Sequence, residues 1–229
     1  MVYKEKDLGY TLVELLLSMV VGVVILAGVY STYTIVARQQ QKISSSAEIH
    51  ESGNSSIRII SRDLRMTGYV SLDTDLETPF GNIATPITIT DSGNACCDSV
   101  QIIYDLDTPM RQRITYYVLP RTNPARNAIY MDKDTWDGFA WTNVTNQSLV
   151  ADYIEDLQFV GSDNNLAGFP SVVDVSMIFR AKNPVATPAV AYAKPTYNVG
   201  NYNFTANDSY LRDEFTTTVT LKNLRDASF

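Results

Sequence analysis

Few residues in this chain have types and spacing that could support chemistry, and the clearest is a carboxylate at the start of an apolar segment. Glu14 is followed by 23 uncharged residues, Leu15 to Ala37, most of which are Leu, Val, Ile or Ala. In a helix this run covers about 34 Å, enough to cross a hydrocarbon core of about 30 Å. A charge beside such a segment is costly in lipid, so Glu14 is a candidate functional residue.

The chain offers little support for catalysis or metal binding. His50 is the sole histidine and no G-x-S-x-G sequence is present, so we predict no catalytic residue and expect a packed or half-exposed helical side chain. Asp132, Asp134, Asp137 and Gly138 are spaced somewhat like a calcium loop. The spacing is shifted from D-x-D-x-D-G and no glutamate follows at the proper distance. We therefore expect an acidic turn there, with no metal site and no cofactor.

Cys96 and Cys97 are adjacent in sequence and are the only two cysteines. Neighbouring Cα atoms lie about 3.8 Å apart, below the roughly 4.4–6.8 Å that is usual across a disulfide. Two free thiols are also unfavourable in an oxidising compartment. The sequence leaves both alternatives open: a disulfide between these residues, or free or intermolecular thiols.

The N-terminus resembles the prepilins of the type IV pilin and type II pseudopilin family. A short charged leader ends in Gly9, and Tyr10-Thr11-Leu12-Val13-Glu14 then opens the apolar run. The resemblance implies that a prepilin peptidase cuts between Gly9 and Tyr10 and methylates the new amine of Tyr10. Tyr10 departs from the phenylalanine that usually comes first in the mature protein.

The same resemblance suggests a role for Glu14. After cleavage, the amine of Tyr10 is a positive charge within lipid, where a carboxylate can neutralise it strongly because the dielectric is low. The resemblance implies that Glu14 of one subunit pairs with Tyr10 of its neighbour and sets the register of a filament. The alternative is that Glu14 only caps the start of its own helix.

A second motif lies at the end of the expected helix. The stretch 61–69, Ser-Arg-Asp-Leu-Arg-Met-Thr-Gly-Tyr, resembles the R-D-L-R-x-x-G-Y signature of PilW-like minor pilins, and J-type pseudopilins have a similar region. The segments 154–159 and 218–224 resemble later strands of the same group. The resemblance implies a pilin-like fold, with a long helix packed on a mainly antiparallel sheet.

Periodicity supports the same α+β fold class. An amphipathic helical period of three or four residues continues beyond Arg38, and Gly68 offers a stop; the recurring positions are Ile43, Ala47, His50, Asn54, Ile57, Ile60 and Leu64. We expect a hairpin from 99–105 and 112–119, with further strands at 86–90, 127–131, 172–181 and 215–224. The proline-rich stretch 182–210 reads as a long irregular loop whose tyrosines are candidates for partner recognition.

The expected organisation has four parts. Residues 1–9 are the leader, 10–37 the membrane-spanning or filament-core helix, 38–67 its amphipathic continuation, and 68–229 a β-rich periplasmic or extracellular domain.

The resemblance implies a minor pilin rather than an enzyme. The expected partners are other pilin and minor pilin subunits, prepilin peptidase and the bacterial inner membrane, with final placement in a pilus at the cell surface. The formal net charge of −7 argues against nucleic acid binding. Two alternatives remain open: a J-type minor pseudopilin of a type II secretion system, and a tip adhesin or DNA-uptake receptor.

Overall fold

A computed structural model describes residues 11–71, 83–93, 96–106, 110–136, 138–164, 168–184, 190–193 and 205–225. The chain divides into two compact units, residues 1–44 and residues 45–229, and each is described by itself.

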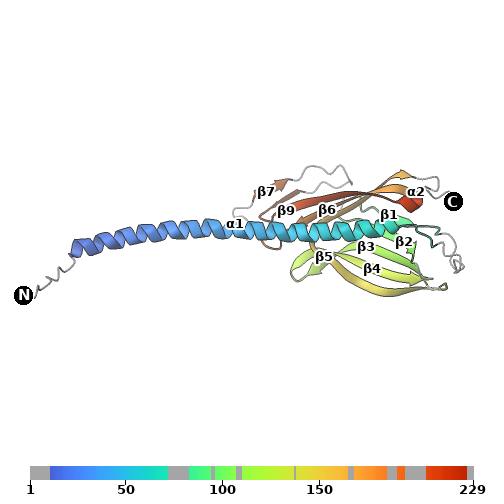
Figure 1. Cartoon of the computed structure of the whole chain (residues 1–229), viewed down its shortest axis with the longest axis horizontal. Coiled ribbons are helices and arrows are strands. Elements are labelled where there is room, and N and C mark those ends of the chain that lie inside the picture. Colours follow the sequence, from blue (N-terminus) through green and yellow to red (C-terminus); the bar gives the residue numbers. More distant parts are fainter. Residues whose placement is uncertain are drawn as a thin grey trace, which may run out of the picture. The chain divides into compact units, whose positions relative to one another are not determined.

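One helix, α1 (Leu12–Met66), accounts for most of the N-terminal part of the chain (Figure 1). It ends close to the predicted position because Gly68 adopts a φ of 73°, which a residue with a Cβ rarely adopts. The amide of Gly68 then donates to the carbonyl of Ile103, so the chain leaves the helix directly onto a strand.

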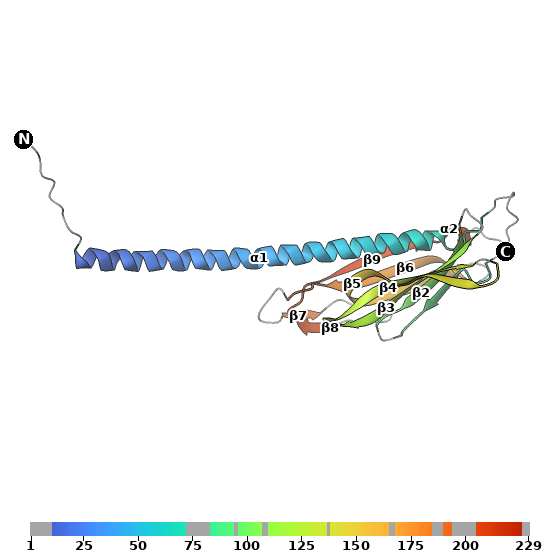
Figure 2. The ribbon, with the colours of Figure 1, turned by 90° about the horizontal axis from the view of Figure 1, so that it is seen from below.

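A seven-stranded antiparallel sheet forms the body of the second unit, with the strand order β1-β2-β3-β4-β5-β6-β9. Its strands are β1 (Ile87–Thr90), β2 (Ser99–Asp105), β3 (Arg111–Thr122), β4 (Ala125–Trp136), β5 (Trp141–Asn164), β6 (Pro170–Arg180) and β9 (Arg212–Thr220). The predicted hairpin is present as β2 and β3, with Ile102 paired to Ile114. The C-terminal half of α1 runs along one face of this sheet (Figure 2).

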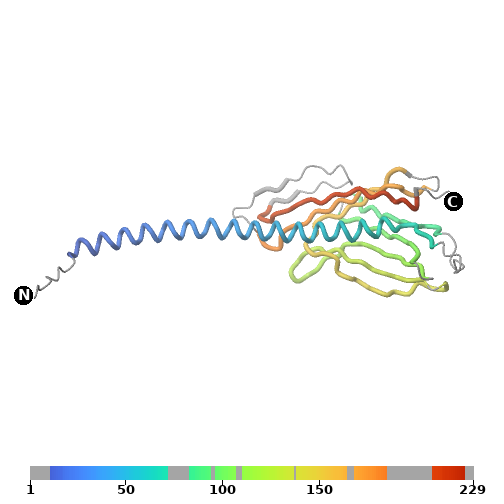
Figure 3. Tube along the Cα trace, viewed as in Figure 1, coloured from blue at the N-terminus to red at the C-terminus, as the bar shows by residue number. Residues whose placement is uncertain are grey.

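β5 has 24 residues and joins the two halves of the sheet, a path that can be followed in Figure 3. Its first part, up to Ile154, pairs with β4, and its second part, from Ile154 onward, pairs with β6. The predicted strands covered none of its first half, because residues 141–153 are mostly polar and lack a clean alternation.

Three other predictions about the strands differ from the structure in part. The region 182–210 contains β7 (Val190–Ala193) and β8 (Thr205–Asp208), which pair into a separate two-stranded sheet. The last strand lies at 212–220 rather than 215–224, and the short helix α2 (Lys222–Arg225) follows it. The strand predicted at 127–131 is part of the longer β4, because backbone pairing with β3 and β5 carries it through the polar residues beyond Met131.

The core of the second unit lies between α1 and the facing side of the sheet. Ile49, Ile60 and Leu64 of α1 pack against residues such as Val100 and Met177 of the strands. Burying an apolar side chain of this size contributes about 1.5–3 kcal/mol, so this cluster supplies much of the free energy that holds the helix to the sheet.

Candidate functional site

The first candidate site is the beginning of α1, where Thr11 and Glu14 form a reciprocal cap. The amide of Thr11 and its hydroxyl each donate to Glu14 Oε2 at 3.2 Å. The amide of Glu14 donates back to Thr11 Oγ1 at 3.3 Å. This arrangement is a capping box, which satisfies backbone donors that the first turn of a helix otherwise leaves without a partner.

The helix beyond this cap is apolar and exposed. Its large hydrophobic side chains from Leu12 to Val36 are exposed in the single chain, and α1 is long and apolar enough to cross a membrane. A contiguous apolar surface of this extent indicates lipid or partner contact. The peptide bond between Gly9 and Tyr10, where cleavage is predicted, lies outside the described residues.

The second motif, around Asp63, attaches α1 to the sheet. Asp63 is 2% exposed, and its Oδ2 accepts a hydrogen bond of 2.6 Å from the hydroxyl of Tyr116 in β3. Arg62 donates to the other oxygen of Asp63 at 2.9 Å. Burial, together with the nearby negative charge of Asp63, raises the pKa of Tyr104 to about 12 and that of Tyr116 further. Asp63 of the motif therefore joins the helix to the sheet through Tyr116.

Cys96 and Cys97 form a disulfide in the structure, within a loop that Asp98 attaches to β5. Asp98 Oδ1 accepts from the amide of Ser92, and Oδ2 accepts from the amide of Phe159, each at 2.9 Å. The carboxylate of Asp156 lies within 4.8 Å of both sulfur atoms. Sulfur binds metals as a thiolate, so the disulfide is not a ligand in this state.

The calcium-like sequence is divided between a strand and the connection that follows it. Asp132 and Asp134 lie within β4 rather than in the predicted acidic turn, whereas Gly138 lies between β4 and β5. Asp132 accepts from the hydroxyl of Tyr117, and Asp134 pairs with Arg113 on β3 at 2.7 Å. Pairing between the strands has brought these partners within reach, and Asp137 lies outside the described residues.

His50 packs on the helix as expected, half-exposed. Its Nε2 lies 3.3 Å from Asp213 Oδ2, and its ring meets the ring of Phe215 edge-on. Both partners belong to β9, so His50 helps to attach α1 to the last strand.

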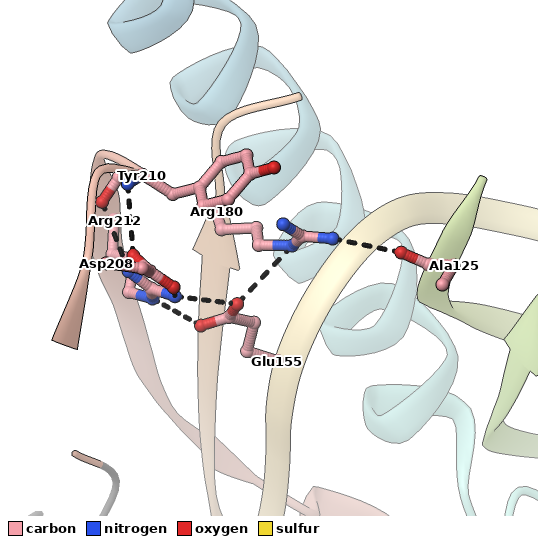
Figure 4. Close-up of polar contacts among 6 residues, drawn as sticks. All are labelled: Ala125, Glu155, Arg180, Asp208, Tyr210 and Arg212. Carbon is pink, nitrogen blue, oxygen red and sulfur yellow. Dashed lines mark hydrogen bonds and ion pairs between the residues drawn. The ribbon is translucent and has the colours of Figure 1, made fainter. Parts of the chain in front are cut away.

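A polar network fixes the junction between β8 and β9 (Figure 4). Arg212 contacts both Glu155 on β5 and Asp208 on β8, with Nη2 3.0 Å from Glu155 Oε1 and 2.6 Å from Asp208 Oδ2. Arg180 reaches Glu155 at 3.4 Å and donates to the carbonyl of Ala125 at 3.1 Å. The hydrogen bond from Arg212 lowers the pKa of Asp208. This network was not predicted, because 57 positions separate Glu155 from Arg212 and 55 separate Arg180 from Ala125.

Beside this network, a cavity of about 220 Å³ lies between α1, the middle of β5 and the end of β6. Ligand pockets usually span about 300–1,000 Å³, so this cavity is small for a cofactor.

Comparison with known proteins agrees with the N-terminal motif and with the fold. Residues 6–30 match the family model described as the prokaryotic N-terminal methylation motif. A solved structure of a type IV-like pilin from Thermus thermophilus has a similar fold, with a TM-score of 0.51 and 16% sequence identity. The similarity covers 76% of this chain and 95% of that one. No curated protein sequence matches the chain. The chain therefore shares a prepilin methylation motif and a pilin-like fold with type IV pilins.

Proposed function

We propose that the chain is a PilW-like minor pilin of a type IV pilus, acting in pilus assembly, in its initiation or at the pilus tip. Prepilin peptidase would remove residues 1–9 and methylate the amine of Tyr10. The apolar helix would hold the chain in the inner membrane until it enters the filament, with the β-rich domain in the periplasm.

The observation that carries this proposal is the exposed apolar surface of α1, with one carboxylate at its start. Facing helices of neighbouring subunits would cover that surface. The large domain favours a minor role, because a domain of this size on every subunit would crowd a filament.

Glu14 would serve two partners in turn. In the single chain Glu14 accepts hydrogen bonds within its own first turn. In a filament, the amine of Tyr10 on a neighbouring subunit would offer a full positive charge to the same carboxylate. A charged partner in low dielectric competes well against neutral donors.

The substitution Glu14→Gln separates these two roles. A glutamine at the third helical position still accepts a hydrogen bond from the N-cap amide, but it carries no charge. The variant would be expressed in a strain that lacks the wild-type gene. We expect Glu14→Gln to reach the membrane in normal amounts but to be absent from the sheared fibre fraction. The cells should then carry no surface fibres. Quantitative immunoblotting of both fractions and electron microscopy of the cells would measure this.

The matched control is Thr11→Ala, which removes the capping hydroxyl and keeps the carboxylate. It should weaken the helix start by about 0.5–2 kcal/mol and still enter fibres. Normal fibres with Glu14→Gln would refute the charge-pairing role, and normal fibres without the gene would refute the role in pilus assembly.

A further inference from the structure

The outer face of the β3–β4–β5 part of the sheet carries two pairs of aromatic rings. Side chains alternate along a strand, so Arg113 and Tyr117 point away from the helix because Ile114 and Tyr116 lie in the core. The facing positions on β4 and β5 continue this outer face. We call it the aromatic face, and its members are Tyr117, Tyr130, Trp136, Trp141, Asp134 and Asn143.

The four rings are arranged as two cross-strand pairs. Trp136 and Trp141 are direct partners with ring centroids 5.5 Å apart, and Tyr117 and Tyr130 are direct partners stacked at 6.2 Å. Each ring is only partly buried. Trp136 lies six positions beyond Tyr130 on β4, so the two pairs lie about 20 Å apart along the strand.

Fixed hydrogen-bonding groups lie between these two pairs. Asp134 Oδ2 accepts from two nitrogens of Arg113, at 2.9 and 2.7 Å, and Asp134 Oδ1 accepts from the side chain of Asn143 at 2.8 Å. The guanidinium of Arg113 also lies 4.5 Å from the ring of Trp141. Ring, carboxylate and amide are therefore ordered before any ligand arrives, which lowers the entropic cost of binding.

The backbone beside the aromatic face departs from regular strand geometry. The pairing of β4 with β5 shifts register near Tyr130, Lys133 and Asp134. Gln147 adopts a φ of 52°, unusual for a residue other than glycine, and its amide donates to Asp132 at 2.6 Å. Bulges and left-handed residues are concentrated at binding sites, where they redirect side chains.

We propose that the aromatic face binds a neutral, β-1,4-linked polysaccharide. Pyranose units with equatorial substituents present flat C–H faces that stack on aromatic rings, and their hydroxyls can bond to Asp134 and Asn143. Two ring pairs in line along a strand suit an extended chain of several sugar units. The pairing of Asp134 with Arg113 and the net charge of −7 make an acidic polysaccharide the poorer match. This inference goes beyond the assembly role and does not depend on it.

The two tryptophans of the chain both lie on the aromatic face, so tryptophan fluorescence reports on this surface alone. The full chain would be titrated with chitohexaose and with cellohexaose, in a detergent without a sugar headgroup. We expect a saturable fluorescence change with at least one hexasaccharide. Binding should be at least tenfold weaker for the corresponding monosaccharide, because a single unit spans one ring pair only.

Variants assign the binding to the aromatic face. Calorimetry should show that Trp141→Ala and Asn143→Ala each lose tenfold or more in affinity, while Trp141→Phe keeps most of it because the ring remains. The matched control is Thr216→Ala, an exposed position on β9, which should bind like the wild type. Asn143 is exposed, so its variant tests the surface even if the Trp141 variant folds poorly.

Three results would overturn the proposal. The first is the absence of a saturable change with both hexasaccharides. The second is equal binding of polygalacturonate, which would indicate non-specific adsorption. The third is unchanged binding in Asn143→Ala and Trp141→Ala with circular dichroism like the wild type, which would place the sugar elsewhere. Capture of a protein that shields both tryptophans while neither hexasaccharide binds would identify a protein interface instead.

Discussion

At the scale of single residues, Asp63 gives a physical reason for a motif that the sequence showed only by resemblance. Its carboxylate is buried, and the hydroxyl of Tyr116, which lies 53 positions further along the chain, is its partner. A buried carboxylate without such a donor would be strongly destabilising. The sequence marks Asp63 as one of a run of charged residues, but pairing with a particular tyrosine becomes visible only once β3 is placed beside the helix.

The substitution Tyr116→Phe should change stability and its dependence on pH. Loss of the hydroxyl should lower the free energy of unfolding by about 1–3 kcal/mol at neutral pH, because Asp63 Oδ2 loses its donor and only Oδ1 keeps the hydrogen bond from Arg62. In the wild type the pKa of Tyr116 is raised above its unfolded value of about 10. The neutral phenol therefore stabilises the fold fully below pH 10, and this contribution is lost as pH rises further.

Urea unfolding of the full chain from pH 8 to 12 would measure this effect. The wild type should lose stability steeply above about pH 10. Tyr116→Phe should lose it less steeply, because Tyr104 is then the one tyrosine near Asp63 with a raised pKa that still titrates. Parallel pH profiles for the two proteins would contradict the assignment.

At the scale of elements, close packing of α1 on β9 depends on a glycine. A Cβ at Gly53 would overlap the ring of Phe215. The substitution Gly53→Ala should therefore lower the free energy of unfolding by about 1–3 kcal/mol, although alanine favours helices, because the ring must move. Asn54→Ala is the control, since Asn54 is exposed one position further along and should be neutral or slightly stabilising.

Thermal unfolding followed by circular dichroism would compare these two variants. A Gly53→Ala protein as stable as Asn54→Ala would show that α1 can move away from β9 at little cost.

How far the sequence predicts these elements depends on the length and regularity of each pattern. The span and end of α1 were predicted well, because an apolar run, a helical period and Gly68 agree. The β2–β3 hairpin was also confirmed, because its residues are β-branched and aromatic. β5 was largely missed because its first half is mostly polar, and that half is held by backbone pairing with β4 rather than by a buried face.

Some residues of the candidate sites could also be identified from the sequence, and others could not. Glu14 could be singled out from the sequence because a charge beside an apolar run is visible locally. The ion pairs of Arg113 with Asp134 and of Arg212 with Glu155 could not be predicted, because 21 and 57 positions separate the partners. Asp132 and Asp134 were expected in an acidic turn because their spacing did not fit a calcium loop, whereas the structure places both on one face of β4, as residues two apart on a strand must be.

At the scale of the whole molecule, the N-terminal motif makes a prediction about the mature protein. In cells with an active prepilin peptidase, the chain extracted from membranes should begin at Tyr10 and carry one methyl group on its amine. Intact mass spectrometry would detect loss of residues 1–9 and the added methyl, and a Gly9→Val variant should keep its leader. Retention of the leader in the wild type would remove the amine that Glu14 is proposed to neutralise.

The end of α1 depends on residues that come much later in the chain. The side chain of Asn223 in α2 donates to the carbonyls of Arg65, Met66 and Thr67, and Leu224 packs beside Gly68. Asn223 lies 156 positions after Thr67. During synthesis, the helix therefore emerges from the ribosome long before the side chain of Asn223 that caps its C-terminal end. The apolar segment of α1 is therefore synthesised while the domain is still open, and the contacts of α2 with the end of α1 can form only after α2 has emerged.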